Sequence, residues 1–335
     1  MHTGKSYKIS EFIIWTRKSI YILLLMGILP VTLYHYLNLK WLGIPWTVVA
    51  LLGTATAFIV AFKNTQTYNR TLDAQQVWTG ILNSSRAWGT LSRDFISDSE
   101  KSKKLIYRHL AWLTVLRYEM RGYRIWEASQ KKHNAEYKQY YCIPEQKTAL
   151  QEELSKYLDD DELNYVLTTK NKATQILSLQ SKMLKELYNN QEIVVLQFVD
   201  MERTIKEFFS QQGKSEHIKD SPYPRQYAII NTFLVKLFCF LLPFGMLKEF
   251  DKLNESVEGI MKGNMVWLVI PFSVIISWMY TSLNQVGEST ENPFEGSPND
   301  VPISQISRII EIDLKEMLGE TNLPPFLEPQ HNIIL

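Results

Sequence analysis

The sequence is poor in the residues that build disulfide frameworks and Gly-rich cofactor folds. Its 335 residues include only two cysteines, Cys142 and Cys239, which excludes a disulfide framework and a cysteine-rich zinc site. Glycine and proline are also scarce, at 14 and 13 residues, and long stretches contain neither. This scarcity favours long helices over a many-stranded sheet. We therefore predict an all-α protein.

Signature motifs of the common enzyme classes are missing as well. The chain contains no HExxH, paired CxxC, GxGxxG, GxxxxGK[ST] or GxSxG pattern, and its six histidines are dispersed. Lysine plus arginine number 36 against 35 acidic residues, so the net charge is +1 and gives no bulk attraction to nucleic acid. We expect no enzyme activity, no catalytic residue, no cofactor, no metal site and no nucleic-acid partner.

Long hydrophobic runs, by contrast, are present and gather in two blocks. A helix needs about 20 mainly apolar residues to cross the hydrocarbon of a bilayer. Four segments meet this length: Ser19 to Asn38, Ile44 to Phe62, Ala228 to Leu247 and Met265 to Asn284. Only the third carries a charge, Lys236, whose burial is costly; a role in conduction and contact with water or a backbone carbonyl both stay open. The sequence predicts a multi-pass membrane protein.

The orientation follows from the basic residues near the ends of these spans. Lys5, Lys8, Arg17 and Lys18 precede the first span, whereas the link between the first two spans has only Lys40. No small-residue cleavage site follows the first apolar run, so we interpret it as an uncleaved anchor. Lysine and arginine concentrate in cytoplasmic segments. We expect both termini and the middle of the chain to be cytoplasmic.

The remaining segments predict helices outside the membrane. We divide the chain into residues 1–62 with the first two spans, a cytosolic helical domain at 63–227, spans three and four at 228–284, and a C-terminal loop, short helix and tail at 285–335. Within the middle domain we expect a hinge near Thr168 to Lys172. In the last part we expect an amphipathic helix that stops at Gly319, followed by an extended tail.

Several segments in this order resemble the bestrophin family of ion channels, in particular its bacterial members. The segments are GTATAFIVAFKNTQTYNR (53–70), NSSRAWG (83–89), HLAWLTVLRYEMRG (109–122), EHIKDSPYPRQY (216–227), LFCFLLPFG (237–245) and VGESTENPFEGSPNDVPIS (286–304). The resemblance implies a homopentamer of four-span subunits in the bacterial inner membrane, in contact with lipid and permeated by inorganic ions. The second spans would surround the axis, and the cytosolic helices would extend the pore.

One stripe of the second span is a candidate pore lining. Thr54, Phe58 and Phe62 follow at intervals of four residues and therefore share one helix face. On their own they indicate contact with lipid or with another helix more than a pore. By the resemblance they fall on the hydrophobic neck, where rings of apolar residues can gate by dewetting.

Two further positions come from the resemblance alone. A cytosolic aperture falls near Ile205. The calcium clasp of eukaryotic bestrophins is matched only by Asn292 and Asp300, because the run of consecutive acids is missing. We therefore expect no high-affinity calcium gate. We interpret the acidic residues of this segment as a solvated loop: Glu288, Glu291, Glu295 and Asp300.

The function that these patterns favour is passive conduction of small monovalent ions, with chloride and other anions preferred through the family resemblance. A sodium or potassium channel of the same fold remains open, because the mixed local charges do not decide the sign of the ion. A membrane-anchored helical scaffold is the third hypothesis, in which the spans only tether the middle domain. No repeated halves or broken spans favour a secondary transporter.

Overall fold

The computed structural model describes residues 1–128, 134 and 138–335 of the chain. Its α-helices are α1 (Ile9–Tyr36), α2 (Trp46–Phe95), α3 (Ser99–Arg121), α5 (Leu150–Leu154), α6 (Asp160–Thr168), α7 (Lys172–Asn189), α8 (Val195–Asp220), α9 (Arg225–Lys252), α10 (Val269–Ser289) and α11 (Ile303–Met317). The other elements are short 3-10 helices: Lys40–Leu42, Lys138–Tyr140, Pro144–Gln146, Leu253–Glu255, Gly259–Met261 and Met265–Leu268. Among the described residues no strand longer than an isolated bridge occurs, which confirms the all-α prediction.

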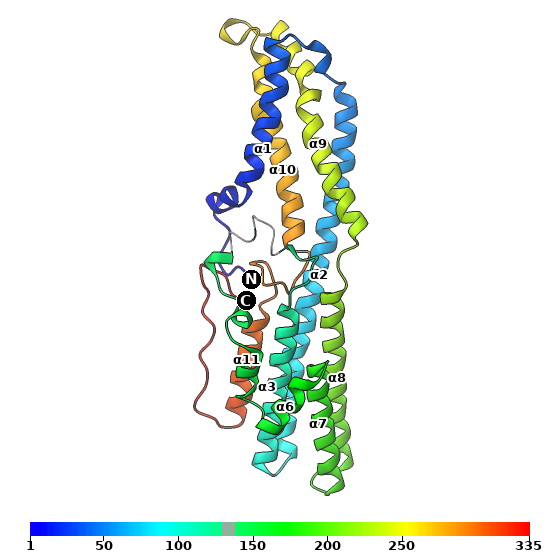
Figure 1. The fold of residues 1–335 in the computed structure, drawn as a ribbon, viewed down its shortest axis with the longest axis vertical. Helices are drawn as coiled ribbons and strands as arrows, with labels where there is room; N and C mark the ends of the chain where they lie inside the picture. Colours follow the sequence, from blue (N-terminus) through cyan, green and yellow to red (C-terminus); the bar gives the residue numbers. More distant parts are fainter. Residues whose placement is uncertain (129–133, 135–137) are drawn as a thin grey trace.

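The molecule is elongated, with two helical layers stacked end to end (Figure 1). The membrane layer contains α1, α9, α10 and the first half of α2, and the outer layer contains α3, α6, α7, α8 and α11. Four helices are long and apolar enough to cross a membrane, which confirms the four predicted spans. The two chain ends lie together where the layers meet, and Ile334 N donates to the Met1 carbonyl oxygen at 2.9 Å.

Helix α2 joins the two layers without a break. Its 50 residues contain no proline, and Pro45 precedes its first turn, where a missing N–H costs nothing. The glycine of the NSSRAWG segment, Gly89, lies against Leu314 of α11, so that a Cβ there would overlap the leucine side chain. Ser85 of the same segment bonds the His109 ring nitrogen Nε2 at 2.8 Å. The predicted boundary between residues 62 and 63 therefore falls inside one continuous helix.

The outer layer packs around an aromatic core. Trp88 and Trp112 are completely buried, and the Phe208 ring lies 5.0 Å from Trp112 and 4.5 Å from His109, between ring centroids. Burial lowers the pKa of His109 to about 3, so the ring is neutral and acts as a packing residue. This core holds α2, α3 and α8 together beneath the membrane layer.

Three smaller predictions are confirmed. The chain turns between α6 and α7 at residues 169–171, where the Asn171 side chain accepts a hydrogen bond from Thr174 N and caps α7. Helix α11 ends at Met317, and Gly319 adopts a positive φ of 76°, the left-handed conformation that a C-terminal glycine supplies. The residues after it form an extended tail.

Candidate functional site

The predicted stripe on α2 points away from the rest of the protomer. Phe58 is 73% exposed and Phe62 is 54% exposed, and Thr54 is exposed as well. The opposite face of the same turns is buried, with Gly53, Thr56 and Val60 packed inward. The Thr54 hydroxyl donates to the Ala50 carbonyl oxygen at 3.0 Å, which satisfies it within its own helix. The stripe is therefore a largely apolar surface, available to water, lipid or a second subunit.

The exposed stripe continues well beyond the residues that the sequence singled out. At 100° per residue, Thr65, Asn69, Gln76 and Asn83 fall within about 20° of Phe58, and all four are exposed. Below Phe62 the face thus changes from aromatic to polar without carrying a charge at these positions. Sequence reasoning missed this continuation because it ended the helix at the membrane surface; the seven-residue spacing of Asn69, Gln76 and Asn83 was the available signal.

Close helix packing supports the stripe from behind. A groove of about 560 Å³ borders Phe58 and is lined by residues that include Gly53, Phe238 and Tyr280. A Cβ on Gly53 would lie 2.7 Å from Phe238 Cε2, and the Tyr280 hydroxyl donates to the Gly53 carbonyl oxygen at 3.1 Å. Small residues permit such approach between membrane helices. Gly53 therefore serves packing within the protomer and fixes α9 and α10 behind the exposed face.

A buried polar cluster lies one residue beyond the second phenylalanine. Lys63 is 1% exposed, and its Nζ lies 3.4 Å from Asn284 Oδ1. Asn231 Nδ2 donates to the same oxygen at 2.5 Å, and Asn284 Nδ2 donates to Glu288 Oε1 at 3.4 Å. Buried charge in a membrane protein is costly, and here the Lys63 ammonium donates to the amide oxygen of Asn284. The cluster fastens α2, α9 and α10 at the end of the membrane layer, and sequence reasoning did not find it.

Arg70, the arginine of the TYNR segment, fastens α2 to the outer layer. Its guanidinium donates to three backbone carbonyl oxygens: Nε to Glu291 at 3.0 Å, Nη1 to Ser221 at 2.7 Å and Nη2 to Ile218 at 2.7 Å. Three fixed donors in one plane suit such a junction. The residue acts as a structural clamp at the point where α8 ends and the loop after α10 begins.

Ile205 does not lie where an aperture requires it. Its side chain is 2% exposed and belongs to the core of the outer layer, together with Met201 and Phe208. This position corrects the sequence prediction, because a residue enclosed by its own protomer presents no surface to an opening. The apolar periodicity of α8 marked the buried face, and the exposed residues of α8 lie on the other side.

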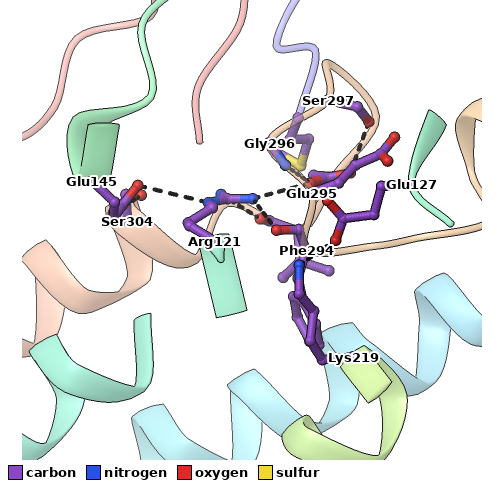
Figure 2. A network of polar contacts seen from close by, with 12 residues as sticks. Arg121, Glu127, Glu145, Lys219, Phe294, Glu295, Gly296, Ser297 and Ser304 are labelled. Carbon is purple, nitrogen blue, oxygen red and sulfur yellow. Dashed lines mark hydrogen bonds and ion pairs between the residues drawn. The ribbon is translucent and has the colours of Figure 1, made fainter. Parts of the chain in front are cut away.

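The loop that follows α10 is buried, which corrects the prediction of a solvated acidic loop. Glu291, Glu295 and Asp300 are 5%, 3% and 2% exposed. Figure 2 shows a polar network centred on Arg121 of α3, whose positive charge compensates part of this negative charge. The Arg121 guanidinium lies 3.0 Å from Asp300 Oδ2 and 3.7 Å from Glu145 Oε2.

The two residues matched to a calcium clasp have different surroundings. Asp300 accepts hydrogen bonds from the Ser297 hydroxyl at 2.7 Å and from Gly296 N at 2.5 Å, in addition to its pairing with Arg121. These donors occupy the carboxylate oxygens that a hard cation would need. Asn292 is 7% exposed, and its Nδ2 has no hydrogen-bond partner among the described residues. In the part of the chain that the structure describes, no group of three or more His, Cys, Asp or Glu residues could hold a metal ion.

Glu295 is the second buried acid of this loop. Its Oε2 accepts a hydrogen bond from Ala128 N at 2.9 Å, while the Oε1 atom has no partner in the described part of the chain. Burial, followed by the nearby Asp300 and Glu127 carboxylates, raises the pKa of Glu295 well above its usual value. Glu127 itself forms a buried ion pair with Lys219 (Figure 2).

Lys236, the charge of the third span, is exposed on α9 and borders a groove of about 390 Å³. The same groove is lined by Arg225, Lys63 and two acidic residues, Glu288 and Glu291. Lys236 therefore opens onto a charged groove and is not enclosed among apolar side chains.

The chain is similar in sequence and fold to known proteins. A family model described as "Bacterial/Fungal Bestrophin protein" matches residues 13–316. The voltage-dependent anion channel-forming protein YneE of Escherichia coli strain K12 is 24% identical over 299 residues, which are 89% of this chain and 84% of that protein. The voltage-dependent anion channel-forming protein sll1024 of Synechocystis is 22% identical over 278 residues, 82% of this chain and 76% of that protein.

Solved structures share the fold. The crystal structure of a bacterial bestrophin homologue from Klebsiella pneumoniae superposes with a TM-score of 0.75 at 21% identity, covering 91% of this chain and 98% of that chain. A second crystal structure, of a protein described only as a membrane protein, gives a TM-score of 0.75 at 22% identity, covering 92% of this chain and 100% of that chain.

Proposed function

The chain belongs to the bacterial and fungal bestrophin family, and from that premise we propose that it forms an ion channel that conducts small monovalent ions passively, with anions preferred. The observation that carries the proposal is the exposed face of α2, which runs from Thr54 through Phe62 to the polar residue Asn83. The 50 residues of α2 are long enough for this face to line a pore through both layers. The anion-channel names of YneE and sll1024 support the preference for anions.

The neck is formed by Thr54, Phe58 and Phe62 from each subunit of a ring, which we propose to be a homopentamer. Rings of phenylalanine exclude water when they are narrow, so the two aromatic levels control passage by dewetting. Below them, the uncharged polar face at Thr65, Asn69 and Gln76 provides hydrogen bonds to hydrated ions. Ions move down their electrochemical gradient, and no chemical step is required.

A cytosolic constriction is better placed at the turn between α7 and α8 than at Ile205. This turn lies at the end of the molecule that is opposite to the membrane layer (Figure 1). It exposes an apolar group in which Val194 is 60%, Val195 is 53% and Leu196 is 75% exposed. Exposed apolar residues at the tip of a soluble bundle mark a contact or a constriction. Asp200 and Arg203 follow on the exposed side of α8.

The organisation around this pore follows the sequence proposal. Residues 63–227 form the cytosolic domain, both termini are cytoplasmic, and the protein resides in the bacterial inner membrane. The meeting of both chain ends at the junction of the two layers supports a common side for the termini. We propose that Arg121 replaces a divalent cation beside Asp300, so that this loop is locked by an ion pair and no calcium gate operates.

Recording from the purified protein in a planar bilayer under a KCl gradient tests the function. A reversal potential near the chloride equilibrium supports the anion channel. A reversal potential near that of potassium assigns a cation channel of the same fold. Reproducible absence of current, together with a monomeric mass in detergent, overturns the channel and favours the membrane-anchored scaffold.

A further inference from the structure

A pocket of about 310 Å³ lies where the first turns of α1 meet the end of α10 and the loop after it. One wall is aromatic and comes from the start of the chain: Tyr7, Phe12 and Trp15 line it, with Glu11 among them. Glu11, Phe12 and Trp15 share a helix face because they are separated by one and four residues. The volume falls in the range of small-molecule sites.

The aromatic wall is held rigidly. Phe12 packs edge-on against Trp278 of α10, with ring centroids 5.7 Å apart, and its ring lies 5.9 Å from Trp15. The Trp278 Nε1 donates to the Thr16 hydroxyl at 2.9 Å, which ties α1 to α10 directly above the pocket. The Tyr7 hydroxyl donates to Asn299 Oδ1 at 3.1 Å and closes the other side. Such preorganisation reduces the cost of ordering a site on binding.

Two opposite charges line the pocket without neutralising each other. Glu11 and Lys138 both border it, and among the described residues no hydrogen bond or ion pair joins either side chain to a neighbour, while Lys138 acts at longer range on the buried Glu295 carboxylate. A carboxylate among aromatic rings is the environment that binds an ammonium group, through its charge and through the ring faces. A lysine ammonium binds phosphate as a point charge. The two together fit a zwitterion.

The floor of the pocket supplies hydroxyl groups. Ser289 of α10 and Ser297 of the loop line it, and the Ser297 hydroxyl also donates to Asp300 Oδ1 at 2.7 Å. Ser297 therefore connects the pocket to the network around Arg121 (Figure 2). A ligand that bonds these hydroxyls contacts the loop that follows the last membrane helix.

The position of the pocket indicates a membrane surface. The same first turns of α1 expose Ile9, Ile13 and Ile14 at 78%, 44% and 54%. Apolar residues exposed at the start of a membrane helix lie at the level of lipid headgroups, and the basic pair Arg17 and Lys18 follows one turn later. The apolar walls of Phe12 and Val286 offer room for the beginning of an acyl chain.

We infer that this pocket binds a phosphoethanolamine group, with its ammonium beside Glu11 and the aromatic rings and its phosphate beside Lys138. The headgroup of an aminophospholipid and the free compound share this chemistry. The inference does not depend on ion conduction, because it rests on the pocket alone.

The test is binding of defined probes to the detergent-solubilised full chain, measured by calorimetry. The probes are dioctanoyl-phosphatidylethanolamine, dioctanoyl-phosphatidylglycerol, which lacks the ammonium, and free phosphoethanolamine. We expect the ethanolamine lipid to bind at least tenfold more tightly than the glycerol lipid. Glu11→Gln should abolish this preference, and Lys138→Gln should weaken the binding of both lipids. The exposed residues Glu258 and Lys262, changed to Gln, serve as matched controls.

The three probes distinguish the two possible sources of the phosphoethanolamine group, a soluble compound and a lipid headgroup. Binding of free phosphoethanolamine as tightly as the lipid assigns a soluble ligand, whereas binding that requires the acyl chains assigns a membrane lipid. Equal affinity for the two lipids, or an unchanged preference in a Glu11→Gln variant with the melting temperature of the native chain, overturns the inference.

Discussion

Arg121 and Asp300 face each other at 3.0 Å in a site where both side chains are 1% exposed, although 179 residues separate them in the chain. The pair joins α3 to the loop that follows the last membrane helix. Each charge compensates the desolvation of the other, and Glu145 adds a second carboxylate to the guanidinium at 3.7 Å. The interface between the two layers therefore depends on a buried ion pair.

Removing one member of this pair should be costly. Arg121→Gln leaves the Asp300 carboxylate buried without its cation, a change that typically costs about 3–5 kcal/mol. Thermal unfolding of the purified protein measures this loss as a lower melting temperature. The exposed pair of Arg203 and Asp200, 3.4 Å apart, is the matched control, and Arg203→Gln should cost less than about 1 kcal/mol. Equal losses in the two variants would contradict the role given to burial.

The neck assignment predicts a gain of current. Changing Phe58 and Phe62 together to Ala removes both aromatic levels, widens the constriction and lets water enter, so single-channel conductance should rise severalfold. Planar-bilayer recording measures the change. Ile22 of α1 is exposed at 56% and provides a control, because Ile22→Ala removes exposed apolar surface from a membrane helix at a position away from the stripe. Unchanged conductance in the double variant would show that the stripe does not line the pore.

Ile205 and Leu196 should respond in opposite ways. Ile205→Ala opens a cavity in the core of the outer layer and should cost about 2–5 kcal/mol of stability. Leu196→Ala, at a side chain that is 75% exposed, should leave the melting temperature within about 1–2 °C while altering relative ion permeability. The two readouts are thermal unfolding and reversal potentials under bi-ionic conditions. A stable Ile205→Ala variant with altered permeability would restore the aperture to that residue.

Two glycines in helices should differ in the sign of their response to alanine. A Cβ at Gly53 would lie 2.7 Å from Phe238 Cε2, so Gly53→Ala forces α9 to shift and should destabilise the protein by about 1–3 kcal/mol. Gly213 of α8 has no neighbouring atom within 4 Å of the same position, and Gly213→Ala should stabilise the protein by about 0.5–1 kcal/mol. Melting temperatures of the two variants test this difference, and a lower melting temperature in both would contradict the packing argument.

Glu119 should make stability depend on pH. Burial, followed by the like charge of Glu216, raises the pKa of Glu119 to about 7, with Lys172 and Arg124 acting in the opposite direction and Asp220 adding to the increase. Between its unfolded value near 4.5 and about 7, the folded protein binds more protons than the unfolded chain. Stability should therefore fall as pH rises through this window.

Glu119→Gln removes the titrating group, so its melting temperature should fall less than that of the native chain between about pH 5 and pH 8. The measurement is thermal unfolding in matched buffers across this range. Glu186 of α7 is exposed, and Glu186→Gln is the control. Parallel pH profiles for the native chain and the Glu119→Gln variant would exclude this carboxyl as the source of the dependence.

The membrane spans were predictable because runs of about 20 apolar residues are rare outside membrane helices. The continuation of α2 beyond the membrane could not be predicted, because Lys63 follows an apolar run and a charge directly after such a run usually marks the end of a span. The structure shows that this lysine points inward to Asn284, so the helix passes through. A sequence gives the position of a charge along the chain but not the side of the helix on which its partner lies.

The buried loop after α10 illustrates a second limit of prediction from sequence. Glu291, Glu295 and Asp300 form an acidic stretch that predicts a solvated loop, since charged residues are usually exposed. Their burial depends on distant groups: Arg121 for Asp300, and Ala128 N for Glu295. That Thr54, Phe58 and Phe62 share one face could be predicted from local helical periodicity, whereas the exposure of that face is seen only in the structure.

Helix α2 runs without a break, so its two ends should move together as one rigid body. Phe95 and Phe58 are 37 residues apart on one helix, a distance of about 55 Å at 1.5 Å per residue. A tilt of about 5° around the Phe95 end would therefore carry Phe58 sideways by about 5 Å. A small rearrangement at the Phe95 end would thus produce a larger displacement in the membrane layer, because α2 has no break between Phe58 and Phe95 that could absorb the motion.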